Sequence, residues 1–281
     1  MTDYLLGLYE KSMPNTLSIY EKLKEAKMAG FDYLELSIDE TDGKLARLEW
    51  GAEEISAINT AQSELNLPIK SLCLSGHRKY PLGSSDEKTR SKGLDIMKKT
   101  IKLASKLGIR IIMIAGYDVY YEESTQQTVE NFSKNLKIAV EMAAREGIIL
   151  GFETMETPFM DNVQKAMKWV NEIKSPYLQI YPDAGNVTNS SLIYQVDPVK
   201  DFLTGEGHLV AVHLKDTTPG IYREIPFGKG HVDFKTITST AYQLGVRMFV
   251  GEFWYTGEEN WQEILKNNNM FLRKFLDTAS H

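Results

Sequence analysis

Four side chains that could bind a metal ion recur in the second half of the chain. They are Glu153, Asp183, His213 and Glu252, and each lies at the end of a short apolar run. The first three are spaced 30 residues apart. Three carboxylates that met in a partly buried site would repel one another strongly, and a divalent cation would remove this repulsion. Because carboxylate oxygens with one imidazole suit Mn²⁺, Mg²⁺, Co²⁺ or Zn²⁺, we predict that these four residues hold one divalent metal ion.

Each of these residues has a less specific interpretation when it is considered alone. A carboxylate at the end of a strand is usually a helix cap or a solvated loop residue. A histidine after an apolar run, such as His213 in LVAVHLKD, is more often a buried core residue than a ligand. The prediction of a metal site therefore depends on a fold that brings the four side chains together.

Eight short apolar runs must position these side chains. They are rich in β-branched and aromatic residues, as strands are, and they read YLLGLYE, FDYLELSID, IKSLCLSGH, IRIIMIAGYD, IILGFET, LQIYPDAGN, LVAVHLKD and RMFVGEFW. Helical patterns separate them, at residues 18–30, 54–66, 89–108, 127–147, 161–173, 197–203, 234–245 and 259–279. Several of these end in a glycine just before the next strand, where a C-cap glycine belongs: Gly30, Gly108, Gly147 and Gly245.

Strands that alternate with helices pair in parallel, and eight such units predict a single (β/α)₈ TIM barrel, one domain over residues 1–281. One unit of such a barrel is roughly 30 residues long, so Glu153, Asp183 and His213 would lie at equivalent heights on successive strands. Active sites of these barrels lie at that end of the strands. The alternative is an open doubly wound sheet, which normally carries a glycine-rich phosphate loop after its first strand. The segment EKSMPNTLS at this position is not such a loop.

The composition is that of a soluble globular protein, with 42% hydrophobic and 25% charged residues. The net charge of −6 argues against nucleic-acid binding, which usually needs a basic face. The single cysteine, Cys73, excludes a disulfide framework and is predicted to be a core residue. The chain does not begin with a basic, apolar leader, and no apolar run approaches the roughly 20 residues of a membrane span. We therefore expect a cytoplasmic protein without a membrane partner.

Several longer stretches resemble a known family when they are taken together with the four strand-end residues. They are LGLYEKSMP, ELSIDETDGKLARLEW, LCLSGHRKYPLGS, AGYDVYYEE, YPDAGN, VAVHLKDTTPG and PFGKGHVDF. They are similar to the L-ribulose-5-phosphate 3-epimerases (also called L-xylulose-5-phosphate 3-epimerases) among the xylose-isomerase-like TIM barrels. The resemblance extends from near the start of the chain to the eighth strand. It implies epimerisation at carbon 3 of a ketopentose 5-phosphate, which interconverts L-ribulose 5-phosphate and L-xylulose 5-phosphate, within L-ascorbate or pentose breakdown.

The resemblance also implies roles for the strand-end residues. In this family the metal ion holds the sugar oxygens on carbons 2 and 3, and Glu153 and Glu252 would be the acid/base pair as well as metal ligands. The chemistry agrees, because a cation on the carbonyl oxygen acidifies the adjacent C–H and stabilises an enediolate. Epimerisation needs two acid/base groups on opposite faces of that flat intermediate, and Glu153 and Glu252 come from strands three apart.

Polar residues near the strand ends are candidates for substrate binding. The set comprises His77, Arg78, Glu156, Asn186, Lys215, Arg223 and Lys229. We expect some of the basic members to bind the phosphate, with glycines at 228 and 230 letting backbone N–H groups approach the anion; solvated loop charges are the alternative. His77, Glu156 and Asn186 are candidates for contacts with sugar hydroxyls. Asp216 is expected to have a loop or cap role.

Three other functions are compatible with parts of this pattern. An aldose–ketose or hexulose-phosphate isomerase would use the same enediolate chemistry between carbons 1 and 2. An apurinic-endonuclease-like phosphodiesterase shares the barrel but needs many histidines, and the chain has five. A non-catalytic sugar-phosphate binder would be expected to have lost a ligand, whereas Glu153 and Glu252 are both present. The predicted partner is a small phosphorylated ketose, and a homodimer is possible.

Overall fold

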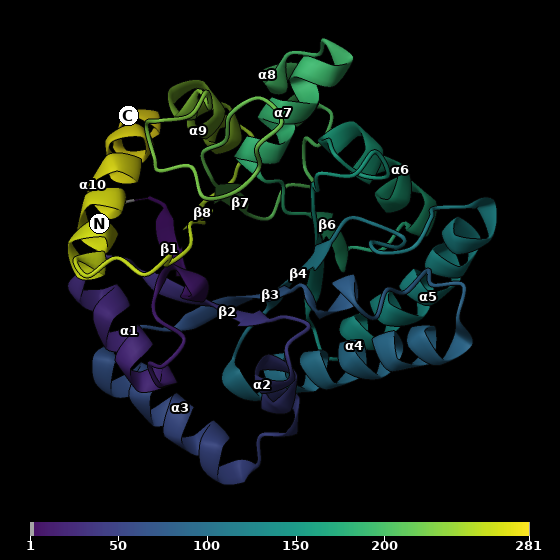
Figure 1. Ribbon diagram of the computed structural model, residues 1–281, viewed down its shortest axis with the longest axis horizontal. Helices are drawn as coiled ribbons and strands as arrows, with labels where there is room; N and C mark the ends of the chain where they lie inside the picture. Colours follow the sequence, from purple (N-terminus) through teal and green to yellow (C-terminus); the bar gives the residue numbers. More distant parts are fainter. Residues whose placement is uncertain (1–2, 281) are drawn as a thin grey trace.

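Residues 3–280 are described in the computed structural model, and their parallel strands form a ring surrounded by helices (Figure 1). The strands are β1 (Leu5–Tyr9), β2 (Tyr33–Ile38), β3 (Ile69–Leu74), β4 (Ile111–Ala115), β5 (Ile149–Glu153), β6 (Leu178–Ile180), β7 (Val212–Leu214) and β8 (Met248–Gly251). They hydrogen-bond in the order β6-β5-β4-β3-β2-β1-β8-β7. Parallel bridges Ile180–Leu209 and Asp183–His213 join β6 to β7 and complete the ring. The predicted (β/α)₈ TIM barrel is confirmed, and the open doubly wound sheet is excluded.

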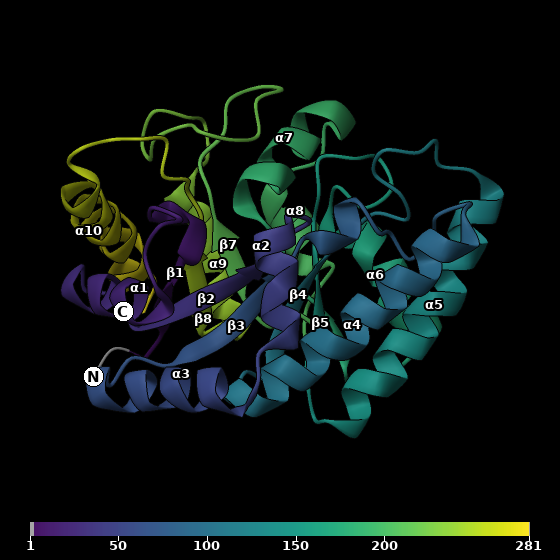
Figure 2. The same ribbon diagram turned by 60° about the horizontal axis from the view of Figure 1, so that its bottom comes forward.

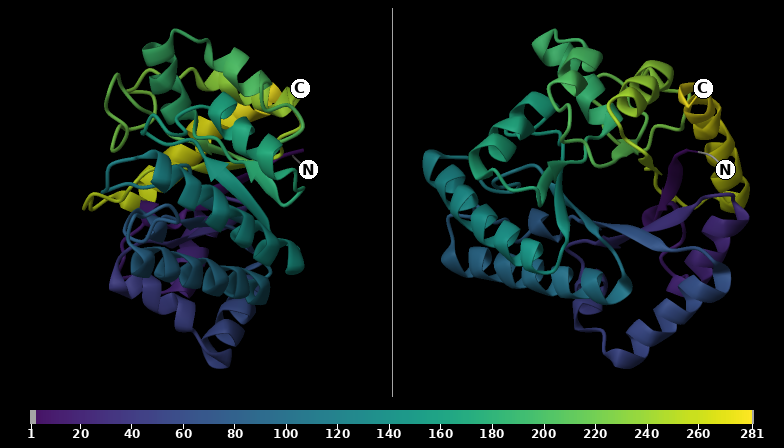
Figure 3. Two further views of the ribbon diagram at one scale, coloured as in Figure 1. Left: turned by 90° about the vertical axis from the view of Figure 1, so that its right-hand side faces the viewer. Right: turned by 180° about the vertical axis from the view of Figure 1, so that it is seen from behind.

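Helices cover the outside of the ring (Figure 3). Those expected from the sequence are α1 (Ile19–Met28), α3 (Ala52–Leu65), α4 (Glu87–Leu107), α5 (Gln126–Arg145), α6 (Val163–Ile173), α8 (Pro198–Leu203), α9 (Phe234–Gln243) and α10 (Trp261–Ala279). The predicted C-cap glycines 30, 108, 147 and 245 have φ values of 89°, 76°, 64° and 89°, the left-handed conformation that ends a helix. Within residues 3–280, none of the helices combines the length and hydropathy needed to cross a bilayer.

Two helices were not predicted, α2 (Asp42–Leu45) and α7 (Ala184–Tyr194), and short 3₁₀ helices occur at Glu10–Ser12, Ala46–Glu49 and Gly76–Arg78. The α7 segment AGNVTNSSLIY lacks the apolar periodicity by which helices are recognised. Its start is nevertheless fixed, because the Asp183 carboxylate accepts the N–H of Asn186 at 2.7 Å. α7 lies at the same rim of the barrel as the long loop between β7 and α9 (Figure 2).

Tyrosines fill much of the barrel interior. Tyr9, Tyr33 and Tyr181 pack with Cys73 and neighbouring apolar residues in a cluster distinct from the larger core between strands and helices. The prediction that Cys73 is a core residue is confirmed, since its exposed fraction is 4%. β1 carries Gly7 because a Cβ there would lie 2.4 Å from the Tyr33 ring. These large rings fill the interior of the barrel below the rim. The polar side chains that could react therefore lie at the rim and in the layer just beneath it.

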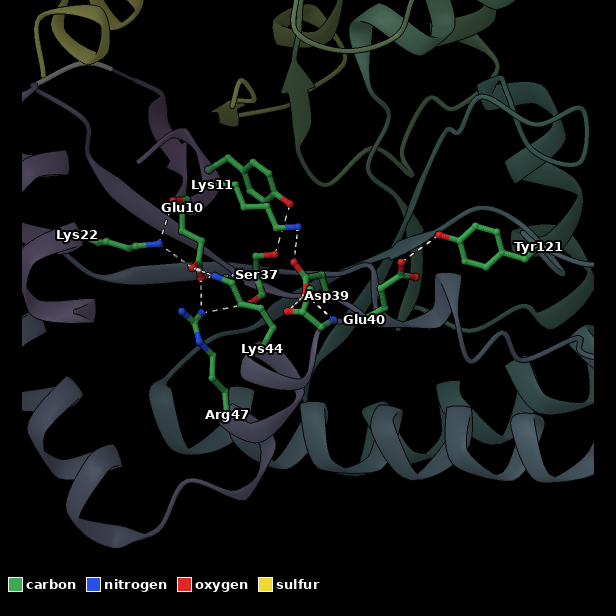
Figure 4. A network of polar contacts seen from close by, with 11 residues as sticks. Glu10, Lys11, Lys22, Ser37, Asp39, Glu40, Lys44, Arg47 and Tyr121 are labelled. Carbon is green, nitrogen blue, oxygen red and sulfur yellow. Dashed lines mark hydrogen bonds and ion pairs between the residues drawn. The ribbon is translucent and has the colours of Figure 1, made fainter. Parts of the chain in front are cut away.

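A buried cluster of charges ties β1 to the elements that follow it (Figure 4). Glu10 is fully buried and accepts the N–H of Ser37 on β2 at 2.7 Å. Its carboxylate also forms ion pairs with Lys22, with Lys44 and, at 2.6 Å, with Arg47. Burial by itself would raise the pKa of Glu10, but the three cations lower it to about 2. This cluster fixes the β1 end of the rim.

Candidate active site

The four predicted metal-binding residues converge at the rim of the barrel. Glu153 ends β5, Asp183 precedes α7, His213 lies in β7 and Glu252 directly follows β8. One ligand atom from each side chain lies within 4.8 Å of the others. Their exposed fractions are between 0% and 7%, so the group is shielded from bulk water. The equal spacing in the sequence therefore corresponds to one compact cluster in space.

The free atoms of this cluster fit a cation. Asp183 Oδ2, His213 Nδ1 and Glu252 Oε2 are buried without a hydrogen-bond partner among residues 3–280. His213 Nδ1 and Glu252 Oε2 lie 3.2 Å apart. Buried polar atoms are rarely left unpaired in folded proteins. Three of them that face one another, drawn from two carboxylates and an imidazole, form a donor set that suits a divalent metal ion.

The electrostatics of the cluster show how strongly its carboxylates interact. Burial and the nearby Glu252 carboxylate raise the pKa of Glu153 to about 8, and burial raises the pKa of Asp183 to about 7. For Glu252 the effect of burial is outweighed by Lys215 and His213, which lower its pKa. Burial and mutual repulsion therefore oppose the simultaneous ionisation of the three carboxylates. A bound cation would favour their ionised forms.

Lys215 lies among these carboxylates. Its Nζ is 3.2 Å from Asp183 Oδ1 and 3.5 Å from Glu252 Oε2, and its side chain is 5% exposed. Lys215 was one of the candidates for binding the phosphate of the substrate. Its ammonium instead lies beside Asp183 and Glu252, two of the predicted metal ligands. Lys215 also lines the pocket above the cluster.

A pocket opens above the cluster, with Glu153 and Glu252 in its lining. Five of the predicted substrate-binding residues line it: Arg78, Glu156, Asn186, Lys215 and Arg223. Several other lining residues were not predicted from the sequence, namely Tyr9, Lys11, Ser75 and Tyr222. Tyr9 ends β1 and Lys11 lies two residues further on, in the 3₁₀ helix Glu10–Ser12, so a search for charges near strand ends could have found Lys11. Ser75 and Tyr222 carry no signal in the sequence that distinguishes them from ordinary loop residues.

Three loops meet over one side of this pocket. Glu156 Oε1 accepts hydrogen bonds from Arg223 at 2.9 Å and from the Tyr120 hydroxyl at 2.8 Å. The Arg78 guanidinium lies over the Tyr120 ring, 4.8 Å from its centroid. Arg78 has no ion-pair partner in the described part of the chain, and its Nε is buried without a hydrogen bond. It is therefore the cation best placed to receive an anionic group of a ligand.

The structure does not bring His77 to the pocket. The residue is 4% exposed, and its Nε2 lies 3.1 Å from the carbonyl oxygen of Gly93 in α4. Burial lowers the pKa of His77 to about 4, so the ring is neutral at pH 7 and does not attract phosphate. The predicted role of His77 in substrate binding does not fit this placement; the residue fastens the β3 loop to α4.

The buried position of His77 predicts a dependence of stability on pH. The unfolded chain takes up a proton on this ring near pH 6.5, whereas the folded chain does so only near pH 4. The neutral His77 ring therefore makes its full contribution to the free energy of unfolding above pH 6.5. This contribution falls by about 3 kcal/mol as the pH falls towards 4. Urea unfolding of the wild type and of His77→Gln between pH 7.5 and 4 measures this difference. Parallel pH profiles for the two proteins would contradict it.

Lys229 and its flanking glycines also lie away from the pocket lining. The N–H groups of Gly228 and Gly230 do approach an anion, but this anion is the Asp216 carboxylate, at 2.8 and 2.9 Å. Asp216 thus folds the β7–α9 loop back onto the rim, which is the loop role expected for it. Lys229 itself is exposed to solvent. The prediction that Lys229 binds phosphate receives no support from this position.

Glu35 is a further polar residue that was not predicted from the sequence, and it does not belong to the pocket lining. It lies on β2, is fully buried, and its Oε1 is 2.6 Å from Nε2 of His213. One signal was present: FDYLELSID places a carboxylate inside an otherwise buried strand. Charged residues are almost never fully buried unless they are paired, so Glu35 required a partner that only the folded barrel reveals.

Comparison with known proteins agrees with this fold and shows the family. A family model described as a xylose isomerase-like TIM barrel matches residues 23–275. The L-ribulose-5-phosphate 3-epimerase UlaE of Escherichia coli O8 (strain IAI1) is 42% identical over 263 residues, which cover 93% of this chain and 91% of that protein. This chain belongs to the L-ribulose-5-phosphate 3-epimerase family. The predicted family and the predicted enzyme class, a sugar-phosphate 3-epimerase, are thereby confirmed.

Solved structures show how widely the fold of this family is shared. A D-allulose 3-epimerase from Methylomonas sp. superimposes with a TM-score of 0.79 at 17% identity, covering 98% of this chain and 99% of that one. A structure described as L-ribulose 3-epimerase gives a TM-score of 0.77 at 18% identity, covering 99% of this chain and 96% of that one. At such low identity these likenesses establish the barrel, while the family is established by the closer relative.

Proposed function

We propose that this epimerase acts at carbon 3 of a ketopentose 5-phosphate and interconverts L-ribulose 5-phosphate and L-xylulose 5-phosphate. The observation that carries the proposal is the cluster of Glu153, Asp183, His213 and Glu252, with unpaired atoms facing one another at the base of a pocket lined by cations. The UlaE relative supports the substrate, since it is named as an L-ribulose-5-phosphate 3-epimerase.

Glu153 and Glu252 are the proposed acid/base pair. They approach the cluster from β5 and β8, which are separated in the ring by β6 and β7, so that they can face a bound sugar from different sides. One removes the proton from carbon 3 and the other delivers a proton to the opposite face. A divalent cation bound by the four residues would polarise the carbonyl at carbon 2 and so acidify the C–H at carbon 3.

Other residues of the pocket would orient the sugar and its phosphate. Arg78 is the proposed phosphate contact because it has no acidic partner, and Arg223 and Lys11 reach the same pocket while paired with Glu156 and Asp39. The side-chain amide of Asn186 donates a hydrogen bond to the Thr154 carbonyl at 2.7 Å. Its buried Oδ1 is left free to accept one from a substrate hydroxyl. Lys215 would lie near the oxygens of carbons 2 and 3.

A panel of ketose phosphates tests this function. The purified protein, loaded with Mn²⁺, Zn²⁺, Co²⁺ or Mg²⁺, is incubated in D₂O and followed by NMR. We expect L-ribulose 5-phosphate and L-xylulose 5-phosphate to interconvert with deuterium entering at carbon 3. Deuterium at carbon 1 with an aldose product would identify an isomerase instead. Turnover of an abasic DNA substrate, or no turnover at all, would favour the phosphodiesterase or the non-catalytic binder.

The setting of the reaction is part of the proposal. The protein would consist of one catalytic domain, which permits a homodimer. It would act in the cytoplasm on a small phosphorylated ketose, without nucleic acid or membrane as a partner. A place in L-ascorbate or pentose breakdown would follow from the substrate. Growth of a deletion strain on L-ascorbate as sole carbon source, compared with growth on glucose, tests the pathway separately from the chemistry.

A further inference from the structure

Glu35 lies in the layer of the barrel interior directly beneath the metal-binding cluster. Its Oε1 is 2.6 Å from His213 Nε2, and its Oε2 accepts hydrogen bonds from Ser71 at 2.7 Å and from Tyr181 at 2.9 Å. The partners come from β3, the end of β6 and β7, so a single carboxylate joins four parts of the ring. Glu35 has no exposed surface and is not among the residues that line the pocket.

The two nitrogens of His213 have different surroundings. Nδ1 faces the Glu252 carboxylate at 3.2 Å and is one of the unpaired atoms of the cluster, whereas Nε2 faces Glu35. A neutral imidazole carries its proton on one nitrogen and offers a lone pair from the other. A carboxylate that accepts the Nε2 proton leaves the Nδ1 lone pair directed at the cluster. Carboxylate–histidine–metal arrangements of this kind orient the ligand and raise its basicity.

We propose that Glu35 is a positioning residue that holds His213 in the tautomer and orientation needed to bind a divalent cation through Nδ1. The inference rests on the metal site of the proposed function and assigns a task to a residue that does not itself touch the substrate. Glu35 is itself fixed in place, because the Ser71 and Tyr181 hydroxyls occupy the oxygen that His213 does not use. A burial this complete is costly for a carboxylate unless all of its hydrogen bonds are made.

The substitution Glu35→Gln tests the inference through metal affinity rather than activity. Glutamine keeps the shape but removes the charge, and its amide can present N–H₂ to Nε2, which would leave the proton on Nδ1, where no metal can bind. We expect the dissociation constant for Zn²⁺ or Mn²⁺, measured by competition with a chromophoric chelator, to rise by about 10- to 100-fold. Epimerase activity of the variant should recover as the metal concentration is raised.

A matched control separates positioning from general loss of stability. Asp201 in α8 is also a buried carboxylate, 4% exposed, and it accepts the N–H groups of Val163 and Gln164 at the start of α6. Asp201→Asn is expected to lower the melting temperature while leaving the metal dissociation constant within about twofold of the wild-type value. An unchanged dissociation constant in Glu35→Gln, with a lowered melting temperature, would overturn the proposal and leave Glu35 a purely structural residue.

Two milder substitutions keep the test decisive if Glu35→Gln does not fold. Ser71→Ala and Tyr181→Phe each remove one hydrogen bond to Glu35 but retain its charge, and we expect each to weaken metal binding less than Glu35→Gln would. If neither changes the metal dissociation constant, the proposal is wrong. If the wild-type protein itself fails to bind a divalent cation, the proposed function fails, a result distinct from the failure of the Glu35 variants.

Discussion

Replacing Glu252 with glutamine is expected to lower the turnover number for epimerisation by about 10³-fold, within the range lost when a general acid or base is removed. Glutamine retains the size of the side chain, so the loss would report the missing proton carrier rather than a cavity. Because Glu252 is also a proposed metal ligand, the variant is assayed at saturating metal and its metal content is measured by elemental analysis. Undiminished turnover in a metal-loaded Glu252→Gln would refute the proposed mechanism.

Proton exchange distinguishes the two glutamates. If Glu153 and Glu252 act on opposite faces of carbon 3, each is the base for one epimer only. In D₂O, Glu252→Gln should still exchange the carbon 3 proton of one epimer without releasing product, and Glu153→Gln should do so with the other epimer. Exchange of the same epimer by both variants would indicate a single base that acts on both faces. The wild-type protein, which exchanges both epimers, is the reference.

The sequence predicted the meeting of the four candidate metal ligands well because its geometry follows from the repeat of the fold. Parallel strands in a barrel end at one rim, so polar residues at matching positions in successive βα units must be neighbours there. Glu153, Asp183 and His213 share that spacing, and the structure brings them together with Glu252. The barrel was predictable for the same reason, since eight strand and helix patterns alternate without interruption.

The substrate pocket was less predictable because the direction of a loop side chain is not encoded in spacing. His77 and Arg78 are adjacent in one 3₁₀ turn, yet His77 points to Gly93 in α4 and Arg78 lines the pocket. Gly228 and Gly230 do donate to an anion, but to Asp216 of the same chain. In each case a partner 12 to 16 residues away decides the role, and no spacing in the sequence identifies that partner.

Glu35 shows the same limit for the layer beneath the rim. It is 178 residues from His213 in the chain, on the far side of several βα units, and no local pattern links the two. A carboxylate in a buried strand indicates that it has a partner, but the sequence does not show which residue this partner is. α7 escaped prediction for a related reason, because its start is set by Asp183, a residue placed by the rim, rather than by the apolar periodicity of its own sequence.

Removal of divalent metal by a chelator is expected to reduce epimerase activity by at least about 10³-fold while leaving the barrel folded. The fold should survive because Lys215 supplies a positive charge between Asp183 and Glu252, and Glu35 continues to hold His213. Circular dichroism of the chelated protein should match that of the loaded protein. Adding Zn²⁺, Co²⁺, Mn²⁺ or Mg²⁺ should restore activity, with apparent affinity falling in that order.

Lys215→Met tests whether Lys215 balances the charge of the Asp183 and Glu252 carboxylates when no metal is bound. Without the ammonium, the carboxylates of Asp183 and Glu252 lose a neighbouring cation in the metal-free protein, whereas a bound metal ion would still compensate them. The increase in melting temperature on adding metal should therefore be larger in Lys215→Met than in the wild type, since binding to the folded state adds stability by mass action. Equal increases would show that Lys215 does not balance the carboxylates. Full activity after exhaustive chelation, with no metal detected by elemental analysis, would exclude metal-assisted epimerisation.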